Sequence, residues 1–158
     1  MSNVRPHKIM PVPLEYQNTS LDFERFMIDA RDLAGLATTN MAWNMVVGVL
    51  HAFRSRLTVK QALLFADVLP PVVRAIFIEN WNIDEPVRQF SGGTELLAQV
   101  RSVRPEHNFS PANAVEAVAE ALRKHIDNEA FDRVLLALPA GAKEFWARGS
   151  NRGTGSAA

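Results

Sequence analysis

The chain repeats its own pattern of helix signals at an interval of 69 residues. Leu69 and Pro70 end one helical stretch, and Leu138 and Pro139 end another in the same way. The further matched pairs are Thr58 with Asp127, Ile76 with Phe145, and Phe77 with Trp146. A fixed internal period indicates a duplicated supersecondary unit. We therefore predict two tandem units, each built from a long helix, a capped turn, a shorter helix and a proline stop.

Apolar residues recur at helical spacing through most of the chain. Phe23, Phe26, Met27, Ala30 and Leu33 lie three, four, seven and ten positions from the first of them, which is one stripe of an amphipathic helix. No run combines strict alternation with the composition of a strand. The predicted fold is therefore all-α, a helical bundle made of two tandem, pseudo-repeated helical units.

Residues with known preferences for helix ends divide this pattern into helices. Thr58 and Gln61 have the spacing of a capping box, and Gly35 suits the left-handed position that ends a helix. The expected helix starts are a cap at Thr19 or Ser20, the caps Thr58 and Asp127, Pro71 as a first helical residue, and Ser110 as a cap before Pro111.

The two ends of the chain lack this periodicity. We expect a flexible N-terminal arm over residues 1–18, which contains three prolines, and a flexible tail over residues 149–158, which is rich in Gly and Ser. Between them we expect one helical domain, residues 19–148, made of unit one (19–81), a connector (82–93) and unit two (94–148).

Short motifs in both units occur in a recognisable order. They are the opening Phe23-x-x-Phe26, the phrase Arg56-Leu57-Thr58-x-x-x-Ala62, the stop Leu69-Pro70, the segment Ile76-Phe77-x-Glu79-x-Trp81, and, in the second half, Leu96-Leu97-x-x-Val100, Ala137-Leu138-Pro139 and Phe145-Trp146. In this order they resemble the bacterial family catalogued as domain of unknown function 2267, over roughly residues 20–148. The resemblance implies a small helical bacterial protein, and it supplies neither an activity nor catalytic residues.

Composition excludes several classes of chemistry and partner. The chain has no cysteine, so it cannot form a disulfide or use a thiolate, which suits the reducing cytoplasm where we expect the protein. Its 17 basic and 17 acidic residues balance, whereas nucleic-acid binding normally needs a basic excess. No stretch of 18 apolar residues occurs, so we expect no membrane span.

No arrangement of residues with a recognised catalytic or metal-binding spacing is found. The four histidines have no i, i+4 pair, and no Glu-x-x-His string is present. His51 lies off the apolar stripe and is expected to face solvent, while His125 near a helix end suits a structural role. We therefore assign no catalytic residue, no metal ligand and no cofactor, and we lean against an enzyme.

One polar and aromatic cluster remains at the join between the units. Glu79, Asn80, Trp81 and Asn82 follow one another there, and Trp43 is predicted to be a partly exposed aromatic. Residues of these types build ligand clefts. Two interpretations stay open at this stage: Trp81 lines a cleft between the units, or it fills the seam between them.

The sequence favours a non-catalytic helical interaction or scaffold protein that self-associates or binds a protein partner. The alternative is a small-ligand-binding protein that uses the cleft between the two units. The third hypothesis is an enzyme whose site residues are dispersed along the chain.

Overall fold

The computed structural model describes residues 12–90 and 92–147. Within these residues all regular secondary structure is helical and no strand occurs, which confirms the all-α prediction. The helices are α1 (Leu14–Gln17), α2 (Thr19–Ala34), α3 (Thr39–Arg54), α4 (Val59–Ala66), α5 (Pro71–Ile78), α6 (Gly93–Arg101), α7 (Ala114–Arg123), α8 (Asn128–Leu136) and α9 (Ala140–Ala147).

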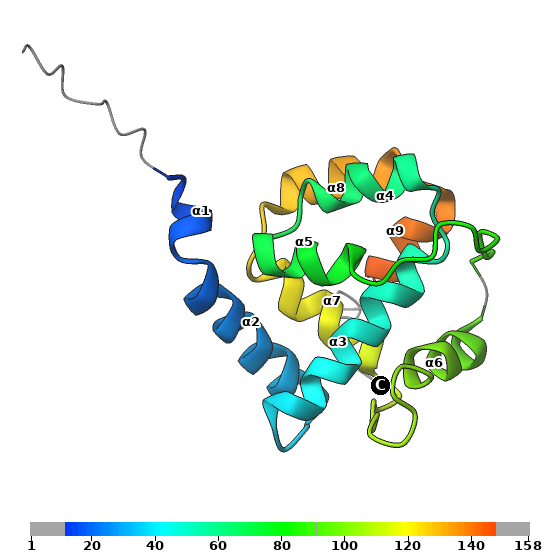
Figure 1. Cartoon of the computed structure of the whole chain (residues 1–158), viewed down its shortest axis with the longest axis horizontal. Coiled ribbons are helices and arrows are strands. Elements are labelled where there is room, and N and C mark those ends of the chain that lie inside the picture. The colour runs from blue at the N-terminus through cyan, green and yellow to red at the C-terminus, as the bar shows by residue number, and fades with distance from the viewer. Residues whose placement is uncertain (1–11, 91, 148–158) are drawn as a thin grey trace, which may run out of the picture.

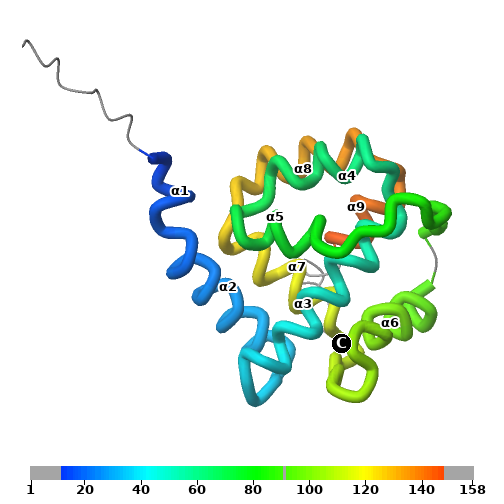
Figure 2. The backbone as a smooth tube through the Cα atoms, viewed as in Figure 1, coloured from blue at the N-terminus to red at the C-terminus, as the bar shows by residue number. Residues whose placement is uncertain are grey.

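The helices surround one shared core (Figure 1). α3 runs diagonally through the molecule and contacts α2, α5, α6 and α7. α4 and α8 lie side by side along one edge, while α1 and the start of α2 project from the body (Figure 2). Each first helix packs against the other half of the chain: α2 against α7, and α6 against α3.

Aromatic side chains from both halves fill the centre of the core. The ring of Trp146 lies 5.2 Å from that of Phe53, 5.6 Å from Phe65 and 5.8 Å from Phe131, between ring centroids. All four side chains are almost inaccessible to solvent. Because each fully buried large side chain contributes roughly 1.5–3 kcal/mol, this cluster stabilises the packing of the two halves against each other.

Several predicted helix ends are confirmed. The Thr58 hydroxyl accepts a hydrogen bond from the Gln61 amide, and the Gln61 side chain accepts one from the Thr58 amide, which completes the capping box. The Asp127 carboxylate caps α8. Gly35 ends α2 with a φ of 68°, a conformation that a residue with a Cβ rarely adopts.

Two predicted helix starts are wrong. α2 begins at Thr19 itself, because the carbonyl of Asn18 accepts from the Asp22 amide and the chain passes almost directly from α1 into α2. α7 begins at Ala114 rather than at Pro111. The Ser110 hydroxyl and amide both donate to the side chain of Asn108, so the hydroxyl is not used as a cap.

Part of the expected flexible arm is helical. Leu14–Gln17 forms the short helix α1, whose Tyr16 hydroxyl accepts a hydrogen bond from Arg74 at 3.0 Å. Residues 1–11 of the expected arm and the whole expected tail, residues 149–158, lie outside the described residues.

The order of helices in the two halves is compatible with the predicted duplication. α4 and α5 start at residues 59 and 71, and α8 and α9 start at 128 and 140, so these starts differ by the predicted interval. The duplication itself stays a prediction. No single helix within the described residues is long and apolar enough to cross a membrane. Taken together, α2 and α3 have sufficient length and apolar composition, but the pair is bent by 91°.

Candidate functional site

The structure brings only part of the predicted cluster together. Asn80 and Asn82 flank Trp81 around a cavity of about 220 Å³ beside α3, and Glu79 immediately precedes them. Trp43 lies near the opposite end of α3, where its ring packs edge-on against Phe23 at 6.1 Å. Trp43 is 37% exposed, as predicted for a partial surface aromatic, but it is not part of the cavity at the join.

Arg54 organises this cavity, and the sequence analysis missed its role. Its guanidinium lies 5.3 Å from the centre of the Trp81 ring. One of its nitrogens donates to the carbonyls of Phe77 and Glu79, at 2.9 and 2.7 Å. These carbonyls belong to the last turn of α5 and the residue that follows it, where a cation is favourable. Arg54 therefore holds the end of α5 and the start of the connector against α3.

His51 reinforces the same attachment. Its Nε2 is 2.8 Å from the carbonyl oxygen of Ile76, and its side chain is half-buried, so the expectation that it faces solvent is wrong. Burial lowers the pKa of His51 below its ordinary value, and the nearby Arg54 adds to this effect, while the bond to Ile76 and the charge of Glu79 oppose it. A neutral imidazole that donates to Ile76 fits these surroundings.

Trp81 neither plugs the seam completely nor stands in an open cleft. Its side chain is partly buried and packs against the core, with Arg54 over its ring. Glu79, Asn80 and Asn82 are exposed, and Asn80 has a φ of 52°, which Asn tolerates better than most residues. The contacts of Arg54 and Trp81 hold the end of α5 and the connector against α3, which is a structural role.

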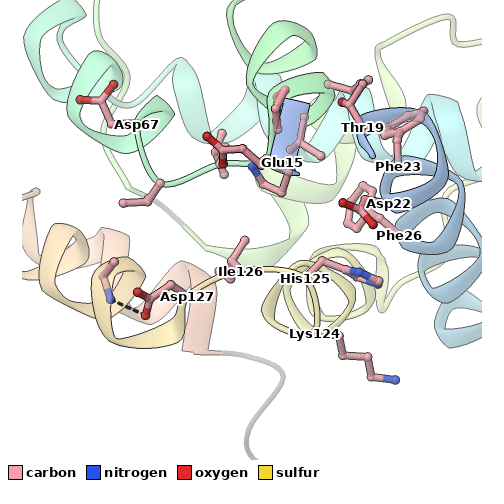
Figure 3. Close-up of a pocket in the computed structure, with 17 residues that line it drawn as sticks. Glu15, Thr19, Asp22, Phe23, Phe26, Asp67, Lys124, His125, Ile126 and Asp127 are labelled. Carbon is pink, nitrogen blue, oxygen red and sulfur yellow. Dashed lines mark hydrogen bonds between the residues drawn. The ribbon is translucent and has the colours of Figure 1, made fainter. Parts of the chain in front are cut away.

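The larger cavity lies on another side of the molecule, and we call it the open groove. Its volume is about 530 Å³, within the usual range for ligand sites. Its walls are formed by the first half of α2, the corner between α4 and α5, and the corner between α7 and α8, with Glu15 of α1 at one side (Figure 3). Its apolar lining residues are Phe23, Phe26, Val68, Leu69, Pro70, Pro71, Val72, Val73, Ile126 and Ala130.

Both corners of the open groove are fixed by side chains that satisfy backbone groups. Arg74 donates to the carbonyls of Ala66 and Leu69, at 2.9 and 3.0 Å, where α4 has ended and proline prevents its continuation. At the other corner, Asp127 caps α8 and the Asn128 side chain donates to the carbonyl of Arg123 at 2.8 Å. The groove therefore has walls whose backbone is held in place.

Acidic residues dominate the rim of the open groove. Glu15, Asp22, Asp67 and Asp127 line it, against Lys124 and His125. Within the part of the chain that the structure describes, no basic side chain forms an ion pair with any of the four. His125 is already paired, because its Nε2 lies 2.6 Å from a carboxylate oxygen of Asp29.

One polar atom at this groove is buried without a partner. The hydroxyl of Thr19, which lines the groove beside Asp22, is inaccessible and makes no hydrogen bond within the described residues. A buried hydroxyl of this kind normally has a partner. The groove thus offers an apolar floor, negative charge at the rim and an unused hydroxyl.

Sequence reasoning missed the open groove because its residues come from three distant stretches. Glu15, Asp67 and Lys124 have no mutual spacing that a motif search recognises. A weak signal existed in the two corners, since Pro70 with Pro71 and the cap Asp127 each marked a change of chain direction. Within the described residues, no group of three acidic or histidine side chains converges closely enough to hold a metal ion.

Comparison with known proteins gives a family but no activity. The family model described as "Uncharacterized conserved protein (DUF2267)" matches residues 23–145. The match begins in α2 and ends in α9, so it covers most of both predicted units and most of the walls of the open groove. It confirms the resemblance that the sequence motifs indicated. No curated protein matches the chain.

Proposed function

We propose that this chain, which belongs to the DUF2267 family of uncharacterised conserved proteins, is a non-catalytic interaction module that binds a segment of another protein in the open groove. The observation that carries the proposal is the groove itself, a cavity of about 530 Å³ with an apolar floor, whose two corners are anchored by hydrogen bonds to the backbone. Grooves between helices that expose apolar side chains are a common means of holding a peptide segment.

The cavity at Trp81 supports the small-ligand alternative less well. Its volume of about 220 Å³ is below the roughly 300–1,000 Å³ of typical ligand pockets. Its most distinctive group, Arg54, already donates to two backbone carbonyls. In the open groove, in contrast, the carboxylates of Glu15, Asp22 and Asp67 and the Thr19 hydroxyl make no hydrogen bond or ion pair within the described residues.

The proposal is tested by panning a library of random peptides displayed on phage against the immobilised protein. The decisive variant is Val72→Trp, because Val72 lines the groove at the second position of α5 and a larger ring there fills the groove without changing its charge. We expect the selected peptides to bind the wild type and to lose at least tenfold in affinity with Val72→Trp. Ile78→Trp, at an exposed position of α5 outside the groove, is the matched control.

Peptides whose binding is unaffected by Val72→Trp would contradict the proposal, and so would a failure to select any peptide. Because the new ring could disturb folding, both variants are first compared with the wild type by circular dichroism and thermal unfolding. Similar spectra and midpoints are needed before affinities are compared.

Self-association is a second proposed property, and exposed leucines favour it. Leu63 of α4 is 55% exposed and Leu136 of α8 is 73% exposed, on helices that lie side by side. The formal net charge of zero adds no long-range repulsion between copies. We expect sedimentation velocity to show a dimer that the double variant Leu63→Lys/Leu136→Lys dissociates; a monomer at all wild-type concentrations would contradict this part of the proposal.

We also propose that the protein acts in the cytoplasm. The support is the absence of cysteine from its sequence, which suits a reducing compartment.

A further inference from the structure

The molecule contains a second groove at positions that the predicted repeat relates to the open groove. The interval is 69 residues for most elements and 70 for the first helices. It matches His125 with Arg56, Phe26 with Leu96, Asp22 with Gly92, and Val72 with Gly141. The structure places Arg56, Leu96, Gly92 and Gly141 together around a cavity of about 260 Å³, which we call the connector groove.

Matched hydrogen bonds show that the two grooves are built alike. Nε2 of His125 lies 2.6 Å from the Asp29 carboxylate, and a guanidinium nitrogen of Arg56 donates to the Gln99 side chain at 2.7 Å. In each case the corner after the second helix of one unit reaches the first helix of the other. A second pair agrees in its donors only: the side chains of Asn44 and of the matched Asn113 donate to the carbonyls of His107 and Leu33, both at 3.2 Å, and these two acceptors are not matched positions.

The connector groove is covered by part of the chain itself. The ring of Phe90 packs on the backbone of Gly141 so closely that a Cβ at position 141 would lie 2.4 Å from its Cγ. The amide of Arg88 donates to the carbonyl of Ser55 at 2.9 Å. An irregular, non-helical stretch shortly before α6 therefore occupies part of the groove through an apolar side chain and a backbone hydrogen bond.

The open groove lacks the equivalent cover within the described residues. The stretch before α2 is the helix α1, which lies at one side of the groove through Glu15 and is bonded to α5 through Tyr16. Lys124, which the repeat matches with Ser55, lines the open groove. We propose that the open groove binds an extended, positively charged segment of a partner protein, which takes the place that residues 87–90 occupy in the connector groove.

The charge of this partner follows from the rim. Four carboxylates line the open groove without an ion pair in the described part of the chain, and Lys124 is directed away from the groove in Figure 3. Lys or Arg side chains can lay their aliphatic stems on the apolar floor and bring their charges to this rim. Val72 stands where Gly141 admits the ring of Phe90, so we expect an aliphatic rather than an aromatic side chain at that point.

This inference rests on the proposed function, and a pair of matched peptides separates the two. The basic probe is the fluorescently labelled peptide Ile-Lys-Lys-Pro-Val-Arg-Gln-Leu, which keeps the apolar residues and length of the connector from position 83 to 90 except for its terminal Leu. The acidic probe, Ile-Glu-Glu-Pro-Val-Glu-Gln-Leu, differs from it in charge. Binding to the full chain is measured by fluorescence anisotropy.

We expect the basic peptide to bind at least tenfold more tightly than the acidic one, and more weakly as salt rises. The double variant Asp22→Asn/Asp67→Asn should weaken its binding at least tenfold, since it removes charge with little change of shape. The matched control Glu106→Gln/Glu129→Gln removes two exposed carboxylates outside the groove and should change affinity less than twofold.

Three outcomes would overturn the inference. The first is equal affinity for both peptides, or no effect of the Asp22→Asn/Asp67→Asn variant. If Val72→Trp still abolishes binding in that case, the groove binds a peptide as proposed, but the peptide need not be positively charged. The second is dissociation of a wild-type dimer by Val72→Trp, which would make a second copy the occupant. The third is that spermidine binds as tightly as the basic peptide, which would remove the argument for an extended chain. If neither peptide binds and panning also fails, the proposed function fails with it.

Discussion

The open groove and the connector groove have corresponding walls but different covers. Each lies between the first helix of one half and the corner after the second helix of the other, at α2 with His125 and at α6 with Arg56. Phe90 lies in the connector groove, whose volume is about 260 Å³, against about 530 Å³ for the open groove. The comparison shows that the walls alone do not determine how much of such a groove is occupied, because a segment before α6 lies in the connector groove and no described segment before α2 lies in the open groove in the same way.

The corner residues differ in burial as well. Arg56 is 2% exposed and pairs with the neutral side chain of Gln99, whereas the side chain of His125 is 19% exposed and pairs with a carboxylate. A covered groove removes its corner residue from water and therefore makes that residue depend on its protein hydrogen bonds. The open groove leaves its corner residue partly solvated, so less stability depends on the pair.

The largest expected effect tests this difference between the corners. Arg56→Ala should lower the free energy of unfolding by about 3 kcal/mol, because it removes a buried side chain together with its bonds to the Ala52 carbonyl and to the partly buried Gln99. His125→Ala, its match, should lower it by about 1 kcal/mol, as expected for a partly solvated pair. Urea unfolding of both variants measures the two losses; equal losses, or the reverse order, would contradict the comparison.

The next prediction concerns the cover of the connector groove. Gly141→Val introduces the residue that stands at the matched position 72, and its side chain would overlap Phe90. We expect a loss of about 2–3 kcal/mol, the usual cost of overpacking a close contact. The measurement is again the free energy of unfolding in urea.

A second substitution shows whether Phe90 is the cause. Adding Phe90→Ala to Gly141→Val should cost less than the sum of the two single losses, because the clash disappears with the ring. Strictly additive losses would mean that the connector is not seated on Gly141.

A smaller loss of stability is expected at Trp81, where the two halves place matched arginines over different rings. Arg54 lies over the ring of Trp81 at 5.3 Å, and Arg123 lies over the ring of Phe131 at 4.9 Å. Trp81 is partly buried, so Trp81→Ala should lower the free energy of unfolding by about 2 kcal/mol. A loss of 3–5 kcal/mol, typical of a fully buried large side chain, would restore the plug interpretation.

Trp81→Leu is the control for the ring itself. It retains much of the apolar surface and removes the aromatic face, so its loss should be smaller than that of Trp81→Ala by the apolar contribution. What remains, about 0.5–1 kcal/mol, is the expected contribution of the cation–π contact with Arg54. No loss with Trp81→Leu would show that the contact with Arg54 does not stabilise the fold.

Local signals in the sequence predicted the helices well. The period of apolar residues, the capping box at Thr58, the cap at Asp127 and the left-handed Gly35 depend on neighbours within a few positions, and each is present in the structure. Ser110 failed as a cap because Asn108 takes its hydroxyl. That competing bond is also local, but the spacing of Ser and Pro alone does not reveal it.

The candidate site could not be predicted in the same way. The open groove joins Glu15, Asp67 and Lys124, whose proximity depends on how α2 packs against α7. Trp43 lies apart from the rest of the predicted cluster for the same reason, since its distance from Trp81 follows from the length of α3. His51 was misplaced because its partner, the carbonyl of Ile76, comes from the packing of α5 on α3.

The smallest expected effect concerns His51, which the repeat matches with Glu120 in the other half. Burial holds the pKa of His51 below its ordinary value of 6.5, with Arg54 acting in the same direction and with the Ile76 bond and Glu79 acting against it. Between that lowered pKa and 6.5, the unfolded chain binds a proton that the folded chain does not. The contribution of His51 to stability is therefore complete above pH 6.5 and is lost as the pH falls through this window.

The change with pH can be isolated with His51→Gln, which keeps a side-chain donor for the Ile76 carbonyl but does not titrate. The difference in free energy of unfolding between wild type and His51→Gln should fall as the pH is lowered from 7.5 to 5, with a slope of at most about 1.4 kcal/mol per pH unit for one proton. Taking the difference removes other titrating groups, including Glu120, from the result. A difference that is independent of pH, or that grows toward acid, would show that the attachment of α5 to α3 does not need a neutral His51.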